Sequence, residues 1–409
     1  MKNLLIIGHT FPEPSTTAAG SRMMQLISLF SEEGYKVTFA TTASISERSA
    51  DLHSLGITSK KIELNNSSFD SFLLETKPSI VLFDRYITEE QFGWRVAEIC
   101  PEATRILDTE DLHFLRKARE TAIKKNLAAT EADIFTDATK REIASILRSD
   151  LSLIISKFEM ELLQASFSVS PEILYYLPFL VEKSSKNDQN TPDFNKRFNF
   201  LTIGNFLHKP NIDAVLWLKK EIWPHIKQEL PDAVIHIYGA YAPQSILELH
   251  NKKDGFLIEG WAQNVDEVMQ NARICLAPVR FGAGLKGKLL DAMANGTPSI
   301  TTSIGAEGMF GELAIPGVIL DDPKAFAKAS VNLYTNEMEW LEAQQNGFRI
   351  VEERFQSELF SVPFIEKIKS LQQNLGEHRI TNFIGQILQH QSMHGSKYMS
   401  KWIELKNKK

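Results

Sequence analysis

The stretch FGAGLKGKLLDAMANGTPSITT, residues 281–302, decides which fold this chain is expected to adopt. It contains the pattern G-x-G-x-x-G at Gly282, Gly284 and Gly287. The apolar run ICLAPV precedes it at residues 274–279, and the helical pattern LLDAMA follows it. A strand, a glycine-rich loop and a helix in this order are typical of a phosphate site. The sequence must then show whether the phosphate belongs to a dinucleotide or to another ligand.

The place of the motif in the chain argues against a dinucleotide. It follows the fourth or fifth predicted strand of the second half, whereas the dinucleotide fingerprint belongs to the first βα turn of a fold. The first βα turn here, IIGHTFPEPS at residues 6–15, carries no such pattern. The acidic residue expected about 20 positions later should end a strand, but Glu307 lies beyond the predicted strand 298–302. An NAD-dependent oxidoreductase is therefore the last of the interpretations kept below.

The same stretch has the chemistry of a diphosphate site. Its glycines let the backbone approach a ligand closely. A helix that begins near Leu285 directs free N–H groups and a partial positive charge toward a phosphate. Lys286 and Lys288 add ammonium groups, and Lys286 is the predicted direct contact because residues two apart cannot share a helix face. One turn further on, Asp291 either accepts hydrogen bonds from a ribose or is a solvated or capping acid.

The chain divides into two halves in which strands and helices alternate. Strands are predicted at residues 4–8, 37–42, 79–84, 104–109 and 151–156, and again at 198–204, 233–239, 255–260, 273–279, 298–302 and 317–322. The polar segment 182–196 indicates a linker between them. This order predicts an α/β fold with two Rossmann-like parallel-sheet domains, 1–181 and 197–360, that face a ligand-binding cleft. Residues 361–409 are predicted to form a helical tail that packs outside or crosses back to the first domain.

Composition excludes several classes of protein. The 409 residues are 43% apolar and 23% charged, which is ordinary for a globular chain, and the net charge of −6 argues against nucleic-acid binding. The apolar run at residues 4–7 is too short for a secretion signal, and no run approaches the ~20 residues of a membrane span. We therefore expect a cytoplasmic protein. The basic segment 117–125 leaves open a peripheral contact with the inner face of the membrane, although a solvated helix face explains it as well.

Residues 279–309, VRFGAGLKGKLLDAMANGTPSITTSIGAEGM, resemble the donor-binding core of GT-B-fold retaining glycosyltransferases. This is the large group, glycosyl transferases group 1 or family 4-like, that builds bacterial surface polysaccharides. Its members carry a G-x-G-x-K-x-K segment, an acidic residue followed by A-M-A-x-G-x-P, and a T-T strand. Residues 202–224 resemble the first C-terminal loop and helix of the family, and residues 107–119 resemble the first-domain segment that faces the cleft. The resemblance covers residues 1 to about 360.

The resemblance implies a role for individual residues. Gly204 and Asn205 would approach the diphosphate or the sugar, and Trp261 and Val265 would border the nucleotide base. The remaining donor-binding residues would hold the diphosphate and the ribose: Gly282, Gly284, Leu285, Lys286, Lys288 and Asp291. His113 and Asp111 would lie near the reacting sugar, in catalytic positions. The acceptor side would include Gly20, Ser21 and Arg22.

The chain departs from the family pattern at several of these positions. Members often carry two glutamates separated by seven residues, and here those places hold Ala283 and Asp291. An arginine and a lysine that follow the glycine of the first C-terminal loop are replaced by Asn205 and Pro210, with Lys209 or His208 as imperfect substitutes. These differences leave the identity of the donor sugar open.

Further residues of the predicted cleft follow from the pattern itself. The loop after the first strand, residues 9–20, is longer than the ~2–6 residues usual for such a connection, which is typical of a binding loop. His113 follows Asp108, Glu110 and Asp111, and nearby carboxylates favour a protonated imidazole. Glu307 is expected either to act on the acceptor or to cap a turn. No Asp-x-Asp motif or metal-ligand cluster is found, so no metal and no cofactor are expected.

Together these features predict a metal-independent glycosyltransferase with a nucleotide-diphosphate sugar as donor and a glycan or lipid-linked acceptor. The resemblance implies that the anomeric configuration is retained. Two alternatives share the fold: a nucleotide-sugar 2-epimerase, and a non-catalytic subunit that binds a nucleotide or a partner enzyme. The alanine at position 283 motivates the second alternative.

Overall fold

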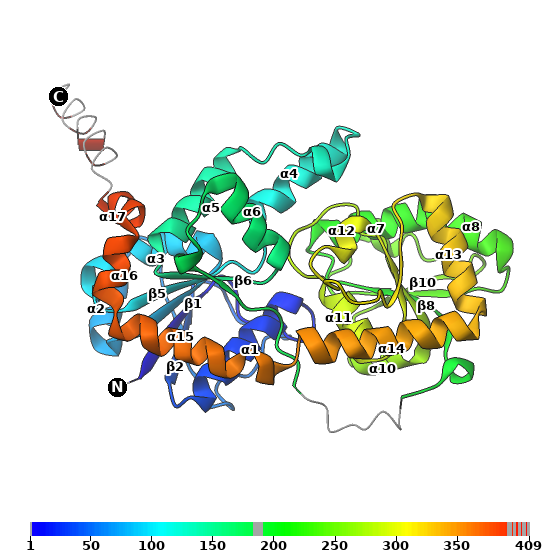
Figure 1. Ribbon diagram of the computed structural model, residues 1–409, viewed down its shortest axis with the longest axis horizontal. Helices are drawn as coiled ribbons and strands as arrows, with labels where there is room; N and C mark the ends of the chain where they lie inside the picture. Colours follow the sequence, from blue (N-terminus) through cyan, green and yellow to red (C-terminus); the bar gives the residue numbers. More distant parts are fainter. Residues whose placement is uncertain are drawn as a thin grey trace.

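The computed structural model of the chain describes residues 2–182 and 191–390, together with residues 395, 398, 399, 402 and 406. These residues form two α/β domains that lie side by side, each built on one parallel sheet (Figure 1). The predicted fold class is confirmed. Residues 183–190 of the predicted linker lie outside the described residues, and residues 191–196 end in the 3₁₀ turn Phe194–Lys196.

The first domain has a seven-stranded sheet in the order β3-β2-β1-β4-β5-β6-β7. Its strands are β1 Asn3–Gly8, β2 Lys36–Thr41, β3 Thr58–Lys61, β4 Ile80–Asp84, β5 Thr104–Asp108, β6 Leu151–Ile154 and β7 Leu174–Tyr176. Its helices are α1 Ala18–Glu32, α2 Ser68–Thr76, α3 Arg85–Ile99, α4 His113–Lys124, α5 Asp137–Arg148 and α6 Lys157–Phe167, with 3₁₀ turns at Ala129–Glu131 and Pro171–Ile173. Strands β4 and β5 are buried along their whole length, because helices cover both faces of a parallel sheet.

The second domain has a six-stranded sheet in the order β10-β9-β8-β11-β12-β13. Its strands are β8 Phe198–Ile203, β9 Ile235–Tyr238, β10 Phe256–Gly260, β11 Ala272–Ala277, β12 Ser299–Thr301 and β13 Gly317–Ile319. Its helices are α7 Lys209–Trp217, α8 Trp223–Glu229, α9 Gln244–Leu247, α10 Val265–Asn271, α11 Gly287–Ala294, α12 Ser303–Ala306, α13 Pro323–Thr335 and α14 Glu337–Arg354, with a π-helical turn Leu218–Ile222 between α7 and α8.

Helix α1 shows how local sequence sets these elements. The Thr17 side chain accepts the Gly20 N–H, which satisfies one free donor of the first turn. The apolar residues Met23, Leu26, Ile27 and Phe30 share one face and are buried against the sheet. The helix begins at Ala18, before the first of these apolar residues, because its cap Thr17 lies in the preceding loop.

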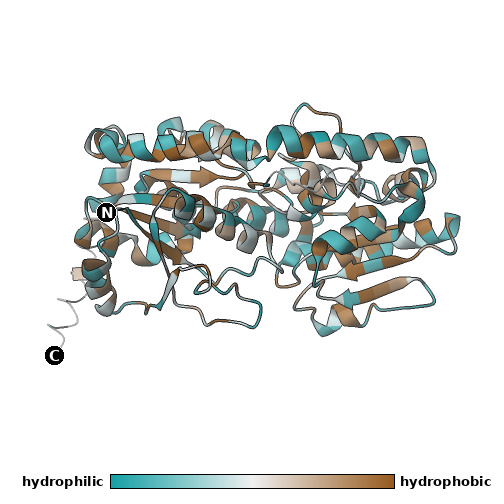
Figure 2. Ribbon diagram, turned by 90° about the horizontal axis from the view of Figure 1, so that it is seen from below, coloured by the Kyte–Doolittle hydropathy of each residue, from teal (hydrophilic) through white to brown (hydrophobic). Residues whose placement is uncertain are grey.

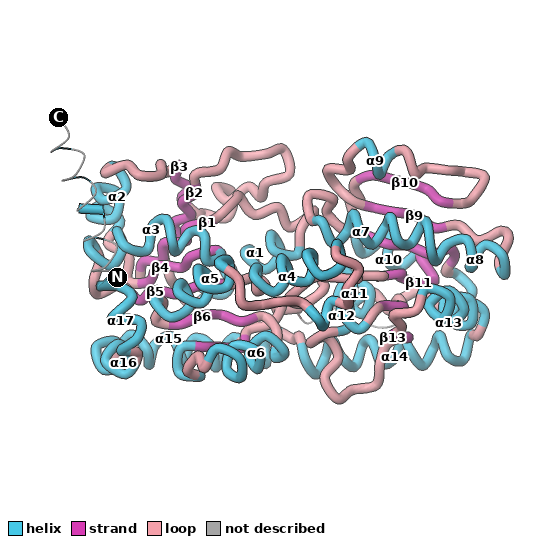
Figure 3. The backbone as a smooth tube through the Cα atoms, turned by 90° about the horizontal axis from the view of Figure 1, so that it is seen from above, coloured by secondary structure: helices cyan, strands magenta, loops and turns pink. Residues whose placement is uncertain are grey.

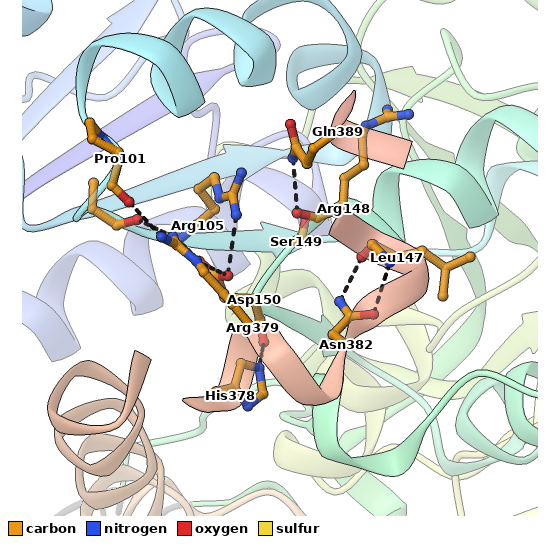
Figure 4. Close-up of polar contacts among 12 residues, drawn as sticks. Pro101, Arg105, Leu147, Arg148, Ser149, Asp150, His378, Arg379, Asn382 and Gln389 are labelled. Carbon is orange, nitrogen blue, oxygen red and sulfur yellow. Dashed lines mark hydrogen bonds and ion pairs between the residues drawn. The ribbon is translucent and has the colours of Figure 1, made fainter. Parts of the chain in front are cut away.

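The chain after residue 360 returns to the first domain (Figure 1). A 3₁₀ turn, Ser357–Leu359, leads into helices α15 Ser361–Gln373, α16 Leu375–Thr381 and α17 Phe383–His390. Apolar side chains of α15 and α16, among them Phe364, Ile368 and Leu375, belong to the same buried cluster as β1 and α1. Polar contacts fix the end of this segment: Arg379 binds Asp150, and Asn382 donates to the carbonyl of Leu147 (Figure 4).

The two sheets direct their carboxyl-end loops toward each other. In each sheet the chain order reverses beside the first strand, between β1 and β4 and between β8 and β11, which is where open α/β sheets bind ligands. Helices α1 and α4 of the first domain lie next to α11 and α12 of the second (Figure 3). The central strands of both domains are mostly apolar, and the helices around them show polar outer faces (Figure 2). In the part of the chain that the structure describes, no helix has the length and apolar character needed to traverse a bilayer.

Candidate active site

The glycine-rich loop joins β11 to α11 and lies against the first domain. Gly284 has a φ of +64°, a conformation that favours glycine. A Cβ atom at this position would come within 2.9 Å of the Asp111 Cβ. The loop backbone thus reaches the segment that carries Asp111 and His113, and the cleft is closed here. Helix α11 begins at Gly287, two residues after the predicted start at Leu285, with Lys286 as its N-cap.

Both predicted lysines of this loop are held in place. The Lys286 ammonium donates to the Gly284 carbonyl at 2.7 Å, and the Lys288 ammonium donates to the Asn211 Oδ1 at 2.9 Å. Burial lowers the pKa of each lysine to about 8. For Asp291, burial and then the charge of Asp266 raise the pKa to about 7. The start of α11 therefore combines ammonium groups and free N–H donors in one shielded place, which suits an anion.

The loop after β8 lies next to the start of α11. The Asn205 Oδ1 accepts the N–H of Leu207 at 2.8 Å, and the main-chain carbonyl of Asn205 accepts the Asn211 side-chain amide at 2.8 Å. A Cβ at Gly204 would come within 2.6 Å of the Asn211 side chain, so the glycine lets the two loops meet. Asn211 also accepts the Lys288 ammonium, so Asn205 and Lys288 belong to one hydrogen-bonded group, and Gly204 lies against its Asn211 side chain.

Trp261 and Val265 line a cavity of about 730 Å³ with Tyr238, residues 262–268 and Ser15 of the first domain. The Trp261 indole N–H donates to the Ser15 carbonyl at 3.0 Å. The long loop after β1 thus forms part of this wall. The Glu13 carboxylate from the same loop accepts the Tyr241 hydroxyl at 2.9 Å. Trp261 and Val265, the two residues predicted to border the nucleotide base, thus line the same cavity.

His113 begins α4, and its Nε2 lies 3.3 Å from the Asp111 Oδ1. Asp111 is itself held by Arg116, whose Nε donates at 2.7 Å. The prediction that neighbouring carboxylates keep His113 protonated is wrong. Burial lowers the pKa of His113 to about 3, and this effect exceeds the opposing effect of the Asp111 charge. The imidazole is neutral at physiological pH and can either donate or accept a hydrogen bond.

The three predicted acceptor residues lie in the first turn of α1. Gly20 packs on the backbone of Glu13, where a Cβ would be only 2.5 Å away, and Ser21 donates to the Pro14 carbonyl. Arg22 is 1% exposed; it binds Asp108 with two nitrogens and donates to the carbonyls of Leu177 and Pro178. The Arg22 guanidinium is fully used inside the domain, with no surface left to offer an acceptor.

Several residues that sequence reasoning did not single out complete the site. Arg119 of α4 donates to the Gly282 carbonyl at 2.9 Å and to both oxygens of Glu307 at 2.8 Å. Glu307 therefore pairs with the first domain, in addition to ending α12. The Glu159 Oε1 accepts the Gly284 N–H at 2.8 Å. Lys209, considered as a donor contact, is exposed and binds Glu120 of α4 at 2.9 Å.

His208 occupies the N-cap position of α7, where its side chain makes no cap hydrogen bond to the described residues, and burial lowers its pKa to about 4. Among the residues that the structure describes, no group of three or more His, Cys, Asp or Glu side chains is arranged to hold a metal ion.

Comparison with known proteins agrees with this geometry. Residues 197–336, which contain β8 to α13, match the family model described as Glycosyl transferases group 1. The second domain is a glycosyltransferase domain. Over 91% of its length the chain resembles sucrose-phosphate synthase from Thermosynechococcus elongatus, with a TM-score of 0.66, 14% identity, and coverage of 99% of the other chain. It also resembles Anabaena HepE in complex with UDP-glucose, with a TM-score of 0.67, 10% identity, and coverage of 91% and 100%.

These likenesses give the fold, which is GT-B: two Rossmann-like domains with the glycosyltransferase domain second. A curated relative is 33% identical over 178 residues, an uncharacterised 44.6 kDa protein in the cps region of Klebsiella pneumoniae. That match covers 41% of this chain and 45% of the relative, so the chain spans less than half the length of that protein.

Proposed function

We propose that this protein transfers a sugar from a nucleotide-diphosphate sugar to a glycan or lipid-linked acceptor, with retention of configuration and without a metal ion. One observation carries the proposal: the start of α11, with the Lys286 and Lys288 ammonium groups, faces His113 and Asp111 across a closed cleft. An anion site on one domain and a neutral imidazole on the other suit transfer between two substrates. The relative in a cps region supports a surface polysaccharide as product.

In this proposal the donor lies along the second domain. The diphosphate contacts the backbone of residues 282–285 and the Lys286 and Lys288 ammonium groups. Asp291 accepts the ribose hydroxyls, and the base enters the cavity beside Trp261 and Val265. Gly204 and Asn205 approach the diphosphate or the sugar. Ammonium groups that are shielded from water stabilise the charge of the departing diphosphate more strongly than exposed ones would.

The first domain supplies the acceptor and the groups near the sugar. The neutral His113 bonds a sugar hydroxyl, and Asp111 holds the imidazole orientation while Arg116 fixes Asp111. The acceptor hydroxyl attacks the anomeric carbon from the face that the diphosphate leaves. The bond from this carbon to the diphosphate oxygen breaks, and the acceptor proton passes to that oxygen. Because Arg22 is buried, only the part of α1 around Ser21 can border the acceptor.

A thermal-shift screen tests the donor site. UDP, GDP, ADP and dTDP are added to the full chain, and one of them is expected to raise the melting temperature. At 100 times its Kd, that nucleotide would stabilise the folded chain by about 2.7 kcal/mol. Lys286→Ala is expected to lose most of that shift, whereas Lys328→Ala, an exposed lysine of α13, keeps it.

The outcomes separate the candidate functions. Transfer of labelled sugar to a glycan or lipid-linked acceptor supports the proposal. Isomerisation of the nucleotide sugar without any acceptor identifies the 2-epimerase, and binding without either reaction identifies the non-catalytic subunit. A melting temperature that no nucleotide changes, or a shift with NAD(H) alone, overturns the proposal.

A further inference from the structure

Glu159 of α6 is a buried carboxylate that no predicted role accounts for. Glu159 is 0% exposed, and among the residues that the structure describes its Oε2 has no hydrogen-bond partner. Its Oε1 accepts the N–H of Leu112 at 3.0 Å and the N–H of Gly284 at 2.8 Å. Leu112 directly precedes His113, and Gly284 lies in the glycine-rich loop of the other domain. One oxygen atom therefore joins the two sides of the cleft.

Such a carboxylate is costly to the fold, because burial disfavours its charge. Burial, and then the charge of Asp111, raise the pKa of Glu159 to about 7. A buried carboxyl group that serves only the fold is expected to satisfy both of its oxygens. Glu159 leaves one unsatisfied and places the other between two loops that must meet for any reaction across the cleft.

Glu142 of α5 shows what a purely local carboxylate does here. It is also 0% exposed, and it accepts the N–H groups of His113 at 3.1 Å and of Phe114 at 2.7 Å. Both of these contacts lie within the first domain, where they satisfy the free donors at the start of α4. Glu142 thus fixes the start of α4 within the first domain. Glu159, in contrast, binds both the first domain, at Leu112, and the second domain, at Gly284.

A second side chain of the first domain, that of Arg119, also binds the glycine-rich loop. Arg119 donates to the Gly282 carbonyl at 2.9 Å, and Glu159 accepts the Gly284 N–H. The loop is therefore bound through an acceptor and a donor two residues apart. Two such bonds restrict both the distance of the loop from α4 and its rotation.

We propose that Glu159 is a positioning residue that sets the place of the glycine-rich loop relative to His113 when the cleft is closed. The catalytic part of this inference rests on the proposed function, because it assumes that the donor lies on this loop and reacts beside His113. The structural part, the link from Glu159 to Gly284, does not depend on that function.

Three variants of the full chain test the inference: Glu159→Ala, Glu159→Gln and the matched control Glu142→Ala. Hydrogen–deuterium exchange is measured over residues 280–288 and 110–118. Glu159→Ala is expected to speed exchange in both segments, whereas Glu142→Ala speeds it in residues 110–118 only. Glu159→Gln keeps an amide oxygen that can accept both N–H groups, so its exchange stays close to that of the wild type.

Sugar transfer supplies the second readout. Loss of both hydrogen bonds that Glu159 accepts is expected to lower kcat of Glu159→Ala about 10- to 100-fold, with the donor KM changed less than about threefold. Glu159→Gln is expected to retain kcat within about threefold. The inference is overturned if exchange over residues 280–288 is the same in Glu159→Ala and the wild type, or if the glutamine variant is as impaired as the alanine variant. If the wild type transfers no sugar, the proposed function fails, and the exchange data still decide whether Glu159 links the loops.

Discussion

The lysines at the start of α11 carry a full charge only up to a limited pH, because burial lowers the pKa of Lys286 and Lys288 to about 8. A bound diphosphate favours the charged ammonium, so binding above pH 8 must be accompanied by proton uptake. We expect nucleotide affinity to fall by up to about tenfold per pH unit above pH 8 for each coupled proton.

Titration calorimetry with the best nucleotide between pH 6.5 and 9.5, in buffers of different ionisation enthalpy, measures this uptake. In the comparison variant Lys288→Arg the guanidinium remains charged over the whole range, so proton uptake should fall by the part that Lys288 contributes, while the part from Lys286 remains. An affinity that stays constant to pH 9.5 in the wild type would show that neither lysine titrates in contact with the ligand.

At this same scale, the sequence could predict only the residues that carry a local pattern. Lys286 and Asp291 stand at fixed offsets from glycines, and His113 follows a predicted strand, so each can be recognised from the sequence alone. Glu159 and Arg119 lie on ordinary amphipathic helices, and their partners belong to the other domain. Nothing in the sequence near them indicates that contact. The protonation of His113 was mispredicted for a related reason, since neighbouring charges can be read from the sequence but burial cannot.

At the scale of elements, apolar runs predicted the central strands well. Strands β1, β4 and β5 begin and end within about a residue of their predicted limits, because they are apolar and buried along their length. Strand β3, Thr58–Lys61, was missed: all of its residues are exposed, and its sequence TSKK has no apolar residue. Such an edge strand forms by pairing with β2, which is a tertiary event.

The starts of α1 and α11 meet in the closed cleft. A substitution that adds one methyl group at Gly287 tests this contact. A Cβ at Gly287 would lie 2.7 Å from the Ala18 Cβ, too close for the two helices to keep their places. Gly287→Ala is expected to leave each domain folded and the N–H donors of α11 intact, but to hold the cleft partly open. We predict a larger radius of gyration by small-angle scattering, unchanged nucleotide affinity and lower kcat.

Gly376→Ala in α16 is the matched control, because its Cβ would meet no atom of the described residues within 4 Å. It should leave scattering and kcat unchanged. Equal scattering curves for Gly287→Ala and the wild type, with full activity, would mean that the contact between α1 and α11 does not limit closure.

At the scale of the whole molecule, the tail makes the first domain depend on the end of the chain. The apolar side chains of α15 and α16 fill the same cluster as β1, so the domain is completed only after the second domain has been synthesised. The sequence showed that the tail is helical but could not show which surface it covers, since apolar faces of similar pattern fit more than one groove. Its polar anchor at Arg379 depends on Asp150, more than 200 positions earlier in the chain.

That anchor gives a stability prediction. The Arg379 Nε and Nη2 donate to the two Asp150 oxygens at 2.8 Å each, and the Asp150 side chain is 3% exposed (Figure 4). Arg379→Met removes the charge while keeping most of the apolar stem, and leaves a buried carboxylate with Arg105 as its remaining cation at 3.4 Å. We expect a loss of about 3 kcal/mol.

The loss should appear as a lower melting temperature and as faster proteolysis between residues 360 and 390. Arg349→Met serves as the control, because Arg349 pairs with Glu353 on the exposed face of α14 and its removal should leave the melting temperature unchanged. If Arg379→Met has the melting temperature of the wild type, the Arg379–Asp150 ion pair does not hold the tail, and the apolar contacts of α15 and α16 carry its stability together with the remaining polar contacts, such as that of Asn382. In that case Phe364→Ala, which opens a cavity in the shared cluster, should destabilise the first domain by about 3–5 kcal/mol.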